Sequence, residues 1–425
     1  MATKFSYGKI FLLGFGFFGV SVIWGVYNAF VPIFLADKFQ LSPIWIGFFM
    51  TLDNIAALFI QPPVGAWSDR LRTPIGRRIP FILVGAPITA LAFGVIPLAS
   101  VLPIFVACTS TLLLSAALWR TPVVALMPDI TPSEKRSQAN GIINFMGGIG
   151  TIVALQTGGM LYKMSPNFPF WLGSVLVIVA ALVVFFFVRE PKEYAETIEE
   201  QPGILQSLRE VMTDPDKSGI RILAAIFFWF IGFSAVDTFF TLYAKNHLGL
   251  PEGDGATLLS VLPLFFVLFA IPSGYIAGKI GRRLTISIGL VMLSIILVLL
   301  YITPAATLLT KVSPLPLVGI PLTEGGPRML TVAGVLLIFG GVAWAFVNIN
   351  SLPMIVDLTS AARIGTFTGL YYLFSTFSAI IGPNVNGFAI ELTGNNYNVI
   401  MLIAPVFMLI SLWLMLGVKR GEATH

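Results

Sequence analysis

The sequence has one cysteine, Cys108, and only two histidines, His247 and His425, in 425 residues. A disulfide framework needs paired cysteines, and zinc sites need clusters of cysteine and histidine, so neither is expected. Charged residues are also scarce, at 11% of the chain, and the mean hydropathy is +0.90. Such a chain lacks the polar surface that a soluble globular protein needs.

Other classes of function are disfavoured by further absences. The sequence shows no converging set of acid, base and nucleophile, so we expect neither an enzyme nor a bound cofactor or metal. The formal net charge is +5. Retention of Lys and Arg in the cytoplasmic loops of membrane proteins explains this excess, so no nucleic-acid partner is expected.

Apolar residues are what the sequence has in abundance, at 56%. Apolar runs of about 20 residues recur along it, each long enough to cross a hydrocarbon layer about 30 Å thick as a helix. The first run is too long for a cleaved signal and lacks a cleavage site, so it is read as a retained span. We predict an all-α membrane protein with twelve transmembrane helices, centred near residues 22, 55, 90, 115, 150, 178, 231, 265, 294, 338, 377 and 406.

A polar segment divides these spans six and six. Between Val188 and Gly219 the chain has mixed charge, with an amphipathic turn around Ile204 to Met212. The predicted organisation is a six-helix bundle over residues 1–188, a cytoplasmic linker over 189–219 and a second six-helix bundle over 220–425.

The distribution of basic residues predicts the orientation. With both termini in the cytoplasm, 19 of the 25 Lys and Arg residues fall in cytoplasmic loops, five fall outside, and Arg120 lies within a span. This asymmetry follows the rule that cytoplasmic loops retain positive charge. We therefore expect a monomer in the cell membrane, plasma or inner, with cytoplasmic termini.

The two halves resemble each other, as expected for a transporter built from repeated bundles. "PVGAWSDRLRTPIGRR" follows span 2 and "PSGYIAGKIGRR" follows span 8. "ALMPDITPSEKRSQANG" follows span 4 and aligns without a gap with "PMIVDLTSAARIGTFTG" after span 10. The matched pairs are Gly65 and Gly274, Gly76 and Gly281, Arg77 and Arg282, Arg78 and Arg283, Asp129 and Asp357, and Gly141 and Gly369.

These loops resemble the major facilitator superfamily, whose hallmark is a Gly-x-x-x-Asp-Arg loop ending in Gly-Arg-Arg between spans 2 and 3. The resemblance implies two pseudo-symmetric six-helix bundles that rock around a central cavity. Independently of the family, acids and arginines at bundle ends can form an ion-pair network that latches one conformation. The predicted cytoplasmic gate motif comprises Gly65, Asp69, Arg70, Gly76, Arg77, Arg78, Asp129, Arg136, Gly281, Arg282, Arg283 and Asp357.

Longer stretches, "QPPVGAWSDRLRTPIGRRIPFILVG" and "RTPVVALMPDITPSEKRSQANG", look like the branch that holds sucrose-proton symporters and glycoside-pentoside-hexuronide:cation symporters. This branch implies import of a glycoside with a coupling cation. The sequence departs from it where the branch carries its charges, because Gln61, Leu113 and Arg120 occupy those positions. Neither coupling scheme therefore transfers intact.

Three ionisable residues lie within predicted spans: Asp53, Arg120 and Asp237. Charges at such depth are costly and usually face a polar interior. Asp53 is predicted to be a proton or cation site whose charge Arg120 balances; the alternative is a structural bridge between spans 2 and 4. Asp237 is assigned either to substrate hydrogen bonding or to coupling.

A sugar site needs aromatic faces and amide groups in an apolar pocket. We predict a cation-coupled sugar or glycoside symporter, with a proton as the coupling ion and sodium as the alternative. The competing function is an exporter or uniporter of another small amphiphilic solute on the same fold. Candidate substrate-binding residues are Trp24, Tyr27, Asn28, Asn54, Asn144, Gln156, Trp229, Asn348, Asn350, Tyr371 and Tyr372.

Overall fold

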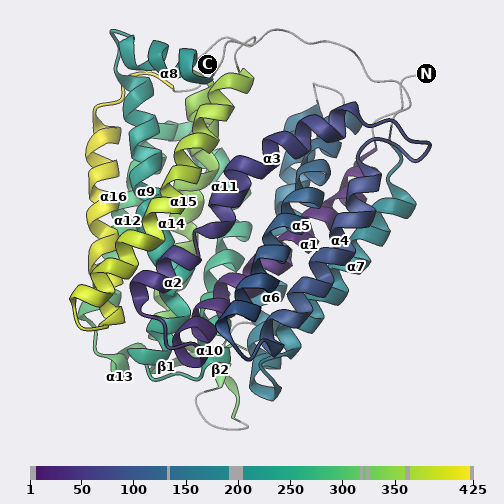
Figure 1. The fold of residues 1–425 in the computed structure, drawn as a ribbon. Coiled ribbons are helices and arrows are strands. Elements are labelled where there is room, and N and C mark those ends of the chain that lie inside the picture. The colour runs from purple at the N-terminus through teal and green to yellow at the C-terminus, as the bar shows by residue number, and fades with distance from the viewer. Residues whose placement is uncertain are drawn as a thin grey trace. The chain divides into compact units, whose positions relative to one another are not determined.

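The computed structural model describes residues 6–131, 135–190, 204–315, 319–321, 326–358 and 364–421. Twelve helical stretches within them are long and apolar enough to cross a membrane, and every predicted span centre falls within one of them. In hydrocarbon a backbone must satisfy its own hydrogen bonds, and a helix does so within one segment. The predicted all-α membrane fold is confirmed (Figure 1).

The first half of the chain supplies six spans. Span 1 is α1 with a short π-helical turn, Phe34–Lys38, and span 2 comprises α2 and α3. The helices are α1 (Tyr7–Ile33), α2 (Pro43–Phe49), α3 (Leu52–Arg70), α4 (Ile79–Val95), α5 (Leu102–Ile130), α6 (Arg136–Met164) and α7 (Phe168–Phe187).

The second half supplies the other six spans, with span 8 made of α10 and α11. The predicted amphipathic turn is the helix α8. The helices are α8 (Ile204–Thr213), α9 (Ser218–Asn246), α10 (Glu252–Leu259), α11 (Val261–Ile280), α12 (Arg282–Ile302), α13 (Ala305–Leu308), α14 (Val332–Val356), α15 (Ile364–Leu392) and α16 (Ile400–Leu416). Antiparallel strands β1 (Lys311–Pro314), β3 (Arg328–Thr331) and β2 (Ile320–Pro321) form a small sheet in that spatial order.

The chain forms two compact units that differ from simple halves at two short segments. Unit 1 comprises Met1–Leu41, Leu52–Thr197 and Glu252–Ser260; unit 2 comprises Ser42–Thr51, Ile198–Pro251 and Val261–His425. Each half thus contributes one short helix to the other unit, α2 to unit 2 and α10 to unit 1. The boundaries predicted from the polar linker remain a prediction.

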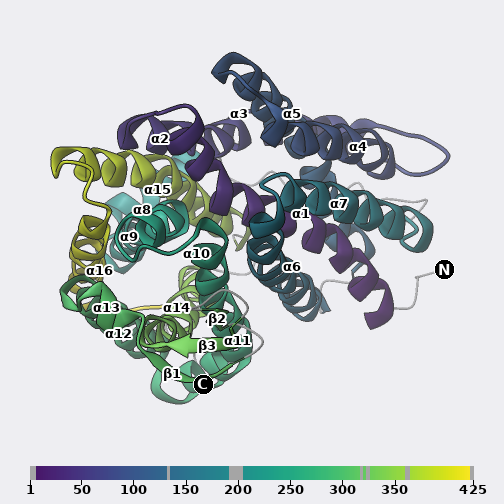
Figure 2. The same ribbon diagram turned by 90° about the horizontal axis from the view of Figure 1, so that it is seen from below.

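Unit 1 is built around α1, which packs against α6 and α7, while α4 packs against α5 and α7. Its exchanged helix α10 lies against α6 (Figure 2). The two backbones approach closely there, since a Cβ added to Gly159 would lie 2.4 Å from the Gly253 carbonyl oxygen. The buried Asp254 carboxylate forms an ion pair with Lys163 of α6 at this contact.

In unit 2, α12 packs against α14 and α16, α9 against α15 and α16, and α11 against α14. The exchanged helix α2 packs on α15 (Figure 2), where an added Cβ on Gly47 would lie 2.3 Å from the Pro383 carbonyl oxygen. The helix α15 runs unbroken through the "GPNVNG" stretch around Pro383, and Asn386 donates to the Gly382 carbonyl oxygen of the same helix at 2.8 Å.

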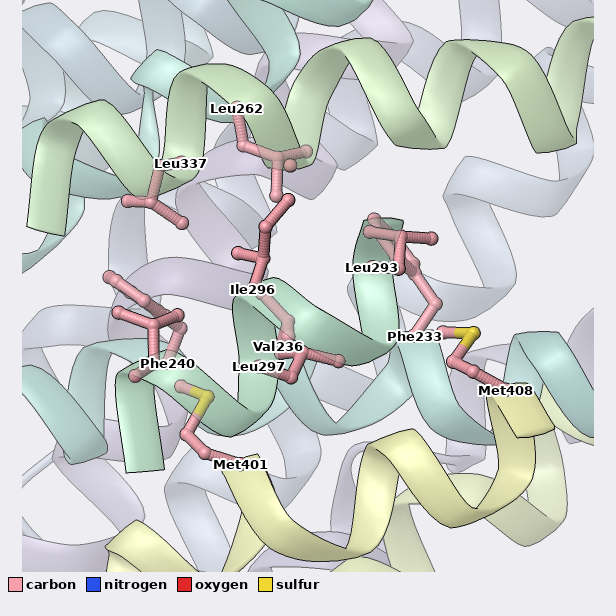
Figure 3. Close-up of a pocket in the computed structure, with 12 residues that line it drawn as sticks. Phe233, Val236, Phe240, Leu262, Leu293, Ile296, Leu297, Leu337, Met401 and Met408 are labelled. Carbon is pink, nitrogen blue, oxygen red and sulfur yellow. The ribbon is translucent and has the colours of Figure 1, made fainter. Parts of the chain in front are cut away.

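Unit 2 also contains an apolar pocket among α9, α11, α12, α14 and α16 (Figure 3). The side chains drawn around it carry only carbon and sulfur. Its lining includes Phe233, Val236 and Phe240 of α9 and Met401 and Met408 of α16. With no polar group in the lining to bind water, this pocket is suited to packing adjustments or small apolar guests.

Candidate functional site

The gate motif of unit 1 lies where α3 turns into α4, at the ends of the spans that the charge distribution predicts to be cytoplasmic, called the inner ends below. Gly76 precedes the two arginines with φ of +113°, a backbone conformation that side chains with a Cβ rarely adopt. This turn presents Arg77 and Arg78 toward the end of α5.

Asp129 of α5 binds both arginines. Its Oδ1 accepts from Arg77 Nη2 at 2.7 Å, and its Oδ2 accepts from Arg78 Nε at 3.0 Å. The Asp129 side chain is 12% exposed, and those of Arg77 and Arg78 are 13% and 5% exposed. One carboxylate therefore joins two largely buried cations in a charge-assisted network.

Asp69 of α3 completes the network from the other side. It pairs with Arg78, which also donates to Ser68 Oγ, and it lies 4.0 Å from Arg77 Nη1. Arg70 is exposed and forms no ion pair with a residue in the described part of the chain. The side chain of Arg136, the remaining predicted member in this half, lies outside the described residues.

Glu190, beyond the end of α7, holds the same turn through its backbone. Its carboxylate accepts from the backbone N–H groups of Arg77, Arg78 and Ile79 at 2.9, 2.8 and 2.8 Å. These groups lie at the start of α4, where unsatisfied donors and the helix dipole favour an anion. A Cβ on Gly76 would lie 2.5 Å from this carboxylate, which gives glycine a second reason to be there.

Unit 2 repeats the motif with fewer acids. Gly281 has φ of +94° and precedes Arg282, which pairs with Asp357 beyond α14 and donates to the Pro353 carbonyl oxygen at 3.3 Å. Arg283 donates to the Val418 carbonyl oxygen at 2.7 Å. Gly278 and Lys279 occupy the positions that correspond to Asp69 and Arg70.

The predicted pairing of the repeats is confirmed in these contacts. Gly76 and Gly281 share a positive φ. The arginine directly after each glycine, Arg77 or Arg282, pairs with the matched aspartate, Asp129 or Asp357. Gly65 and Gly274 do not mark a close approach between helices. A Cβ on Gly65 would make ordinary contact with Thr121 at 3.6 Å, and one on Gly274 would meet nothing within 4 Å.

A second set of predicted residues gathers around Asp53 in unit 1. Asn54 donates to Asp53 Oδ1 at 2.8 Å, and the Asp53 carboxylate acts electrostatically on the Tyr27 hydroxyl. Tyr27 is fully buried, and its hydroxyl has no hydrogen-bond partner among the described residues. Trp24 lies edge-on to Tyr27 with ring centroids 5.5 Å apart, and Asn28 of the same helix is half-buried.

Arg120 lies at a different depth from Asp53. Its neighbour Thr121 contacts Gly65, twelve residues along α3 from Asp53, which corresponds to roughly 18 Å at the helical rise. The helices α3 and α5 do pack together. Direct pairing of Asp53 with Arg120 stays a prediction.

Asp237 lies on an open strip of α9. It is exposed although its neighbours Val236 and Thr238 are buried. Phe233 and Phe230, one and two turns earlier on the same face, are half-buried. A carboxylate exposed to hydrocarbon costs about 2.5–3.5 kcal/mol on insertion scales, so this strip is expected to face water or a ligand.

Aromatic rings from other helices of unit 2 surround this strip. Trp344 of α14 stacks on Phe233 with ring centroids 3.8 Å apart and meets Phe230 edge-on at 5.6 Å. Tyr371 of α15 meets Phe230 at 6.5 Å. We call Phe230, Phe233, Trp344 and Tyr371 the aromatic stripe.

The aromatic stripe extends from the rings to two hydroxyl groups. The Tyr371 hydroxyl lies 3.1 Å from Ser351 Oγ, and the exposed Tyr372 lies edge-on to Tyr371. Two of the predicted candidates, Tyr371 and Tyr372, thus lie together at the Phe230 end of the stripe.

The other candidates are engaged in packing or lie apart. Asn350 is buried and donates to Ser273 Oγ and to the Phe346 carbonyl oxygen, each at 2.9 Å. Three more lie elsewhere: Gln156 accepts from Ser260 Oγ at 2.9 Å, the exposed Asn144 donates to Asn140 of its own helix, and Trp229 is fully buried. Asn348 is half-buried on α14.

Sequence reasoning missed Phe230, Phe233, Trp344 and Glu190. The spacing of Phe230, Phe233 and Asp237 was a usable signal, since residues three and four apart share a helix face. Glu190 had a weaker signal. It follows span 6 directly, but its partners are backbone N–H groups, which leave no complementary residue type in the sequence.

The model of the Major Facilitator Superfamily matches residues 13–383, most of the chain. The chain belongs to the major facilitator superfamily. It is thus an integral membrane transporter of small-molecule substrates, with no catalytic group required by the family.

Among curated relatives, this superfamily member is 26% identical to multidrug resistance protein 2 of Bacillus subtilis (strain 168) over 282 residues, covering 65% of this chain and 67% of that protein. It is also 26% identical to the class B tetracycline resistance protein of Escherichia coli over 278 residues, covering 64% and 66%. The alignments thus span about two thirds of each relative.

Solved structures match over nearly the whole chain. A bacterial homolog of the human lysosomal transporter Spinster, in an inward-facing and occupied conformation, has a TM-score of 0.74 at 13% identity, covering 98% of both chains. The nucleoside transporter NupG has a TM-score of 0.74 at 15% identity, covering 97% of this chain and 100% of that one. These likenesses establish the fold.

Proposed function

We propose that this superfamily member is a cation-coupled exporter of a small amphiphilic solute with aromatic character. The observation that carries the proposal is the aromatic stripe beside the exposed carboxylate of Asp237. Apolar rings with one charged group suit an amphiphile better than a sugar, which needs many hydrogen-bonding partners. The named activities of the relatives, multidrug and tetracycline resistance, support an exporter.

The coupling site is assigned to Asp53, with a proton as the ion and sodium as the alternative. A carboxylate in a span can bind a proton when it is desolvated and release it when water or a positive charge reaches it. The neighbouring amide of Asn54 donates to the carboxylate and holds it in a defined position.

Glycoside symport, which the resemblance to the sucrose and glycoside branch implies, is the second candidate. One observation favours it. Trp24 and Tyr27 combine aromatic faces with the polar groups of Asp53 and Asn54, and the Tyr27 hydroxyl has no partner among the described residues. Against it, Phe233 and Trp344 cover one face of each other, and the amide of Asn350 is used within unit 2.

The test uses purified protein in liposomes with a pH gradient of either direction. An acidic lumen drives accumulation by exchange for protons, whereas an acidic exterior drives accumulation by symport. The panel contains labelled aromatic amphiphiles and labelled glycosides, with protein-free liposomes to correct for trapping. We expect amphiphile accumulation with the acidic lumen, reduced to equilibration by Asp53→Asn.

Asp214→Asn, which removes a carboxylate at the inner surface, is the matched control and should leave accumulation unchanged. Glycoside accumulation with the acidic exterior would establish the second candidate instead. Accumulation that survives Asp53→Asn at full size would remove Asp53 from the coupling site.

A further inference from the structure

We infer that Asp237 and the aromatic stripe form a subsite for an organic cation, so that the exported amphiphile carries a positive charge. This inference rests on the proposed export of an amphiphile and specifies the charge of its substrate. It assigns Asp237 to substrate recognition, one of the two roles that the sequence left open.

The geometry of α9 carries the first step. Phe233 lies four residues before Asp237, one helical turn away on the same face, and both side chains are accessible while the intervening residues are buried. A ligand on this strip can therefore contact a ring and the carboxylate at once.

The rings supply the second step. A cation is attracted to the face of an aromatic ring within about 6 Å of the ring centre. Phe230 and Phe233 are half-buried and offer ring surface to a ligand, while Trp344 and Tyr371, at 6% and 7% exposure, support them through ring contacts.

The carboxylate supplies the third step, selection by charge. Its attraction for a cation at contact distance is far stronger than in bulk water when the surroundings have a lower dielectric constant. A neutral molecule of the same shape gains the ring contacts alone, and an anion is repelled. The preference for a cation should therefore depend on Asp237, while the affinity shared by cationic and neutral ligands should depend on the rings.

The experiment measures equilibrium binding to the full chain in lipid nanodiscs, with empty nanodiscs subtracted. The probes are tetraphenylphosphonium, the isosteric anion tetraphenylborate and neutral triphenylphosphine oxide. We expect wild type to bind the cation at least ten-fold more tightly than the neutral probe. Asp237→Asn should remove this preference and leave the neutral affinity unchanged, and Asp237→Glu should retain it.

Phe233→Leu should weaken the binding of both the cationic and the neutral probe, and Asp214→Asn should change the binding of neither. The inference is overturned if Asp237→Asn leaves the preference for the cation intact or weakens both probes equally. Binding of the neutral probe without a preference for the cation would leave export of an amphiphile standing and remove only the cation subsite. Binding of none of the probes, with a folded protein, would count against both.

Discussion

The inner ends of the two units hold the same Arg-Arg pair after a left-handed glycine, but with different acceptors. In unit 1 three carboxylates surround the turn: Asp69, Asp129 and Glu190. In unit 2 the acceptors given by the described residues are the Asp357 carboxylate and the backbone carbonyl oxygens of Pro353 and Val418. The two units thus place the arginines at matching positions but bind them with different acceptor groups.

The difference in acceptors indicates that the two motifs have different roles. Side-chain carboxylates can be exchanged for other partners when helices move, whereas a carbonyl oxygen at the end of a helix is part of the backbone. Unit 1 therefore has the motif suited to a conformational latch, and unit 2 has one suited to a fixed anchor. Three pairs of variants test this contrast.

The largest effect is expected for Asp129→Ala compared with Asp357→Ala. Removal of Asp129 takes the shared carboxylate away from two largely buried arginines and should cost about 3–5 kcal/mol, the usual loss when one partner of a buried pair is removed. Asp357 is 38% exposed, so its loss should cost about 0–1 kcal/mol. Thermal unfolding in detergent measures the loss of stability in both variants. Equal losses would contradict the proposed difference between the two motifs.

Gly76→Ala compared with Gly281→Ala comes next. Both substitutions force a side chain into positive φ, at a cost of about 1–3 kcal/mol. Gly76→Ala also displaces the Glu190 carboxylate, so it should be the more destabilising of the two. The measurement is again the unfolding midpoint. If Gly281→Ala is equally or more destabilising, the Glu190 contact contributes nothing to the turn.

The smallest effect is expected for Glu190→Gln. Glutamine keeps one acceptor oxygen where the carboxylate has two, so at least one backbone N–H loses its partner at about 1–3 kcal/mol. Glu391→Gln is the control, because Glu391 is exposed and accepts only from the Ile44 N–H at 3.3 Å among the contacts described here. Hydrogen exchange at the start of α4 should quicken for Glu190→Gln alone.

How much the sequence predicted depends on how strongly the environment restricts each residue. The spans were predictable because hydrocarbon admits few charges and requires a self-satisfied backbone, so length and hydropathy determine them. The gate motif was predictable because it occurs twice, and Asp357 could be matched to Asp129 before any contact was known.

The aromatic stripe was not predictable residue by residue. Phe233 and Trp344 lie in apolar spans, where an aromatic that faces lipid has the same sequence surroundings as one that lines a site. Asn350 shows the converse. A polar amide in a span needs a hydrogen-bond partner, and the sequence suggested that a substrate could be that partner. In the structure the partner of the buried Asn350 amide is Ser273.

The exchanged helix α10 has a consequence for how the protein is made. Unit 1 includes Glu252–Ser260, so it remains incomplete while the 54 residues of Ile198–Pro251 are synthesised. At about 5–20 residues per second, this interval lasts roughly 3 to 11 s. During it, the glycine face of α6 around Gly159 lacks its covering helix inside the membrane. Unit 1 therefore completes its packing only after part of unit 2 has been synthesised, when α10 arrives to cover this face.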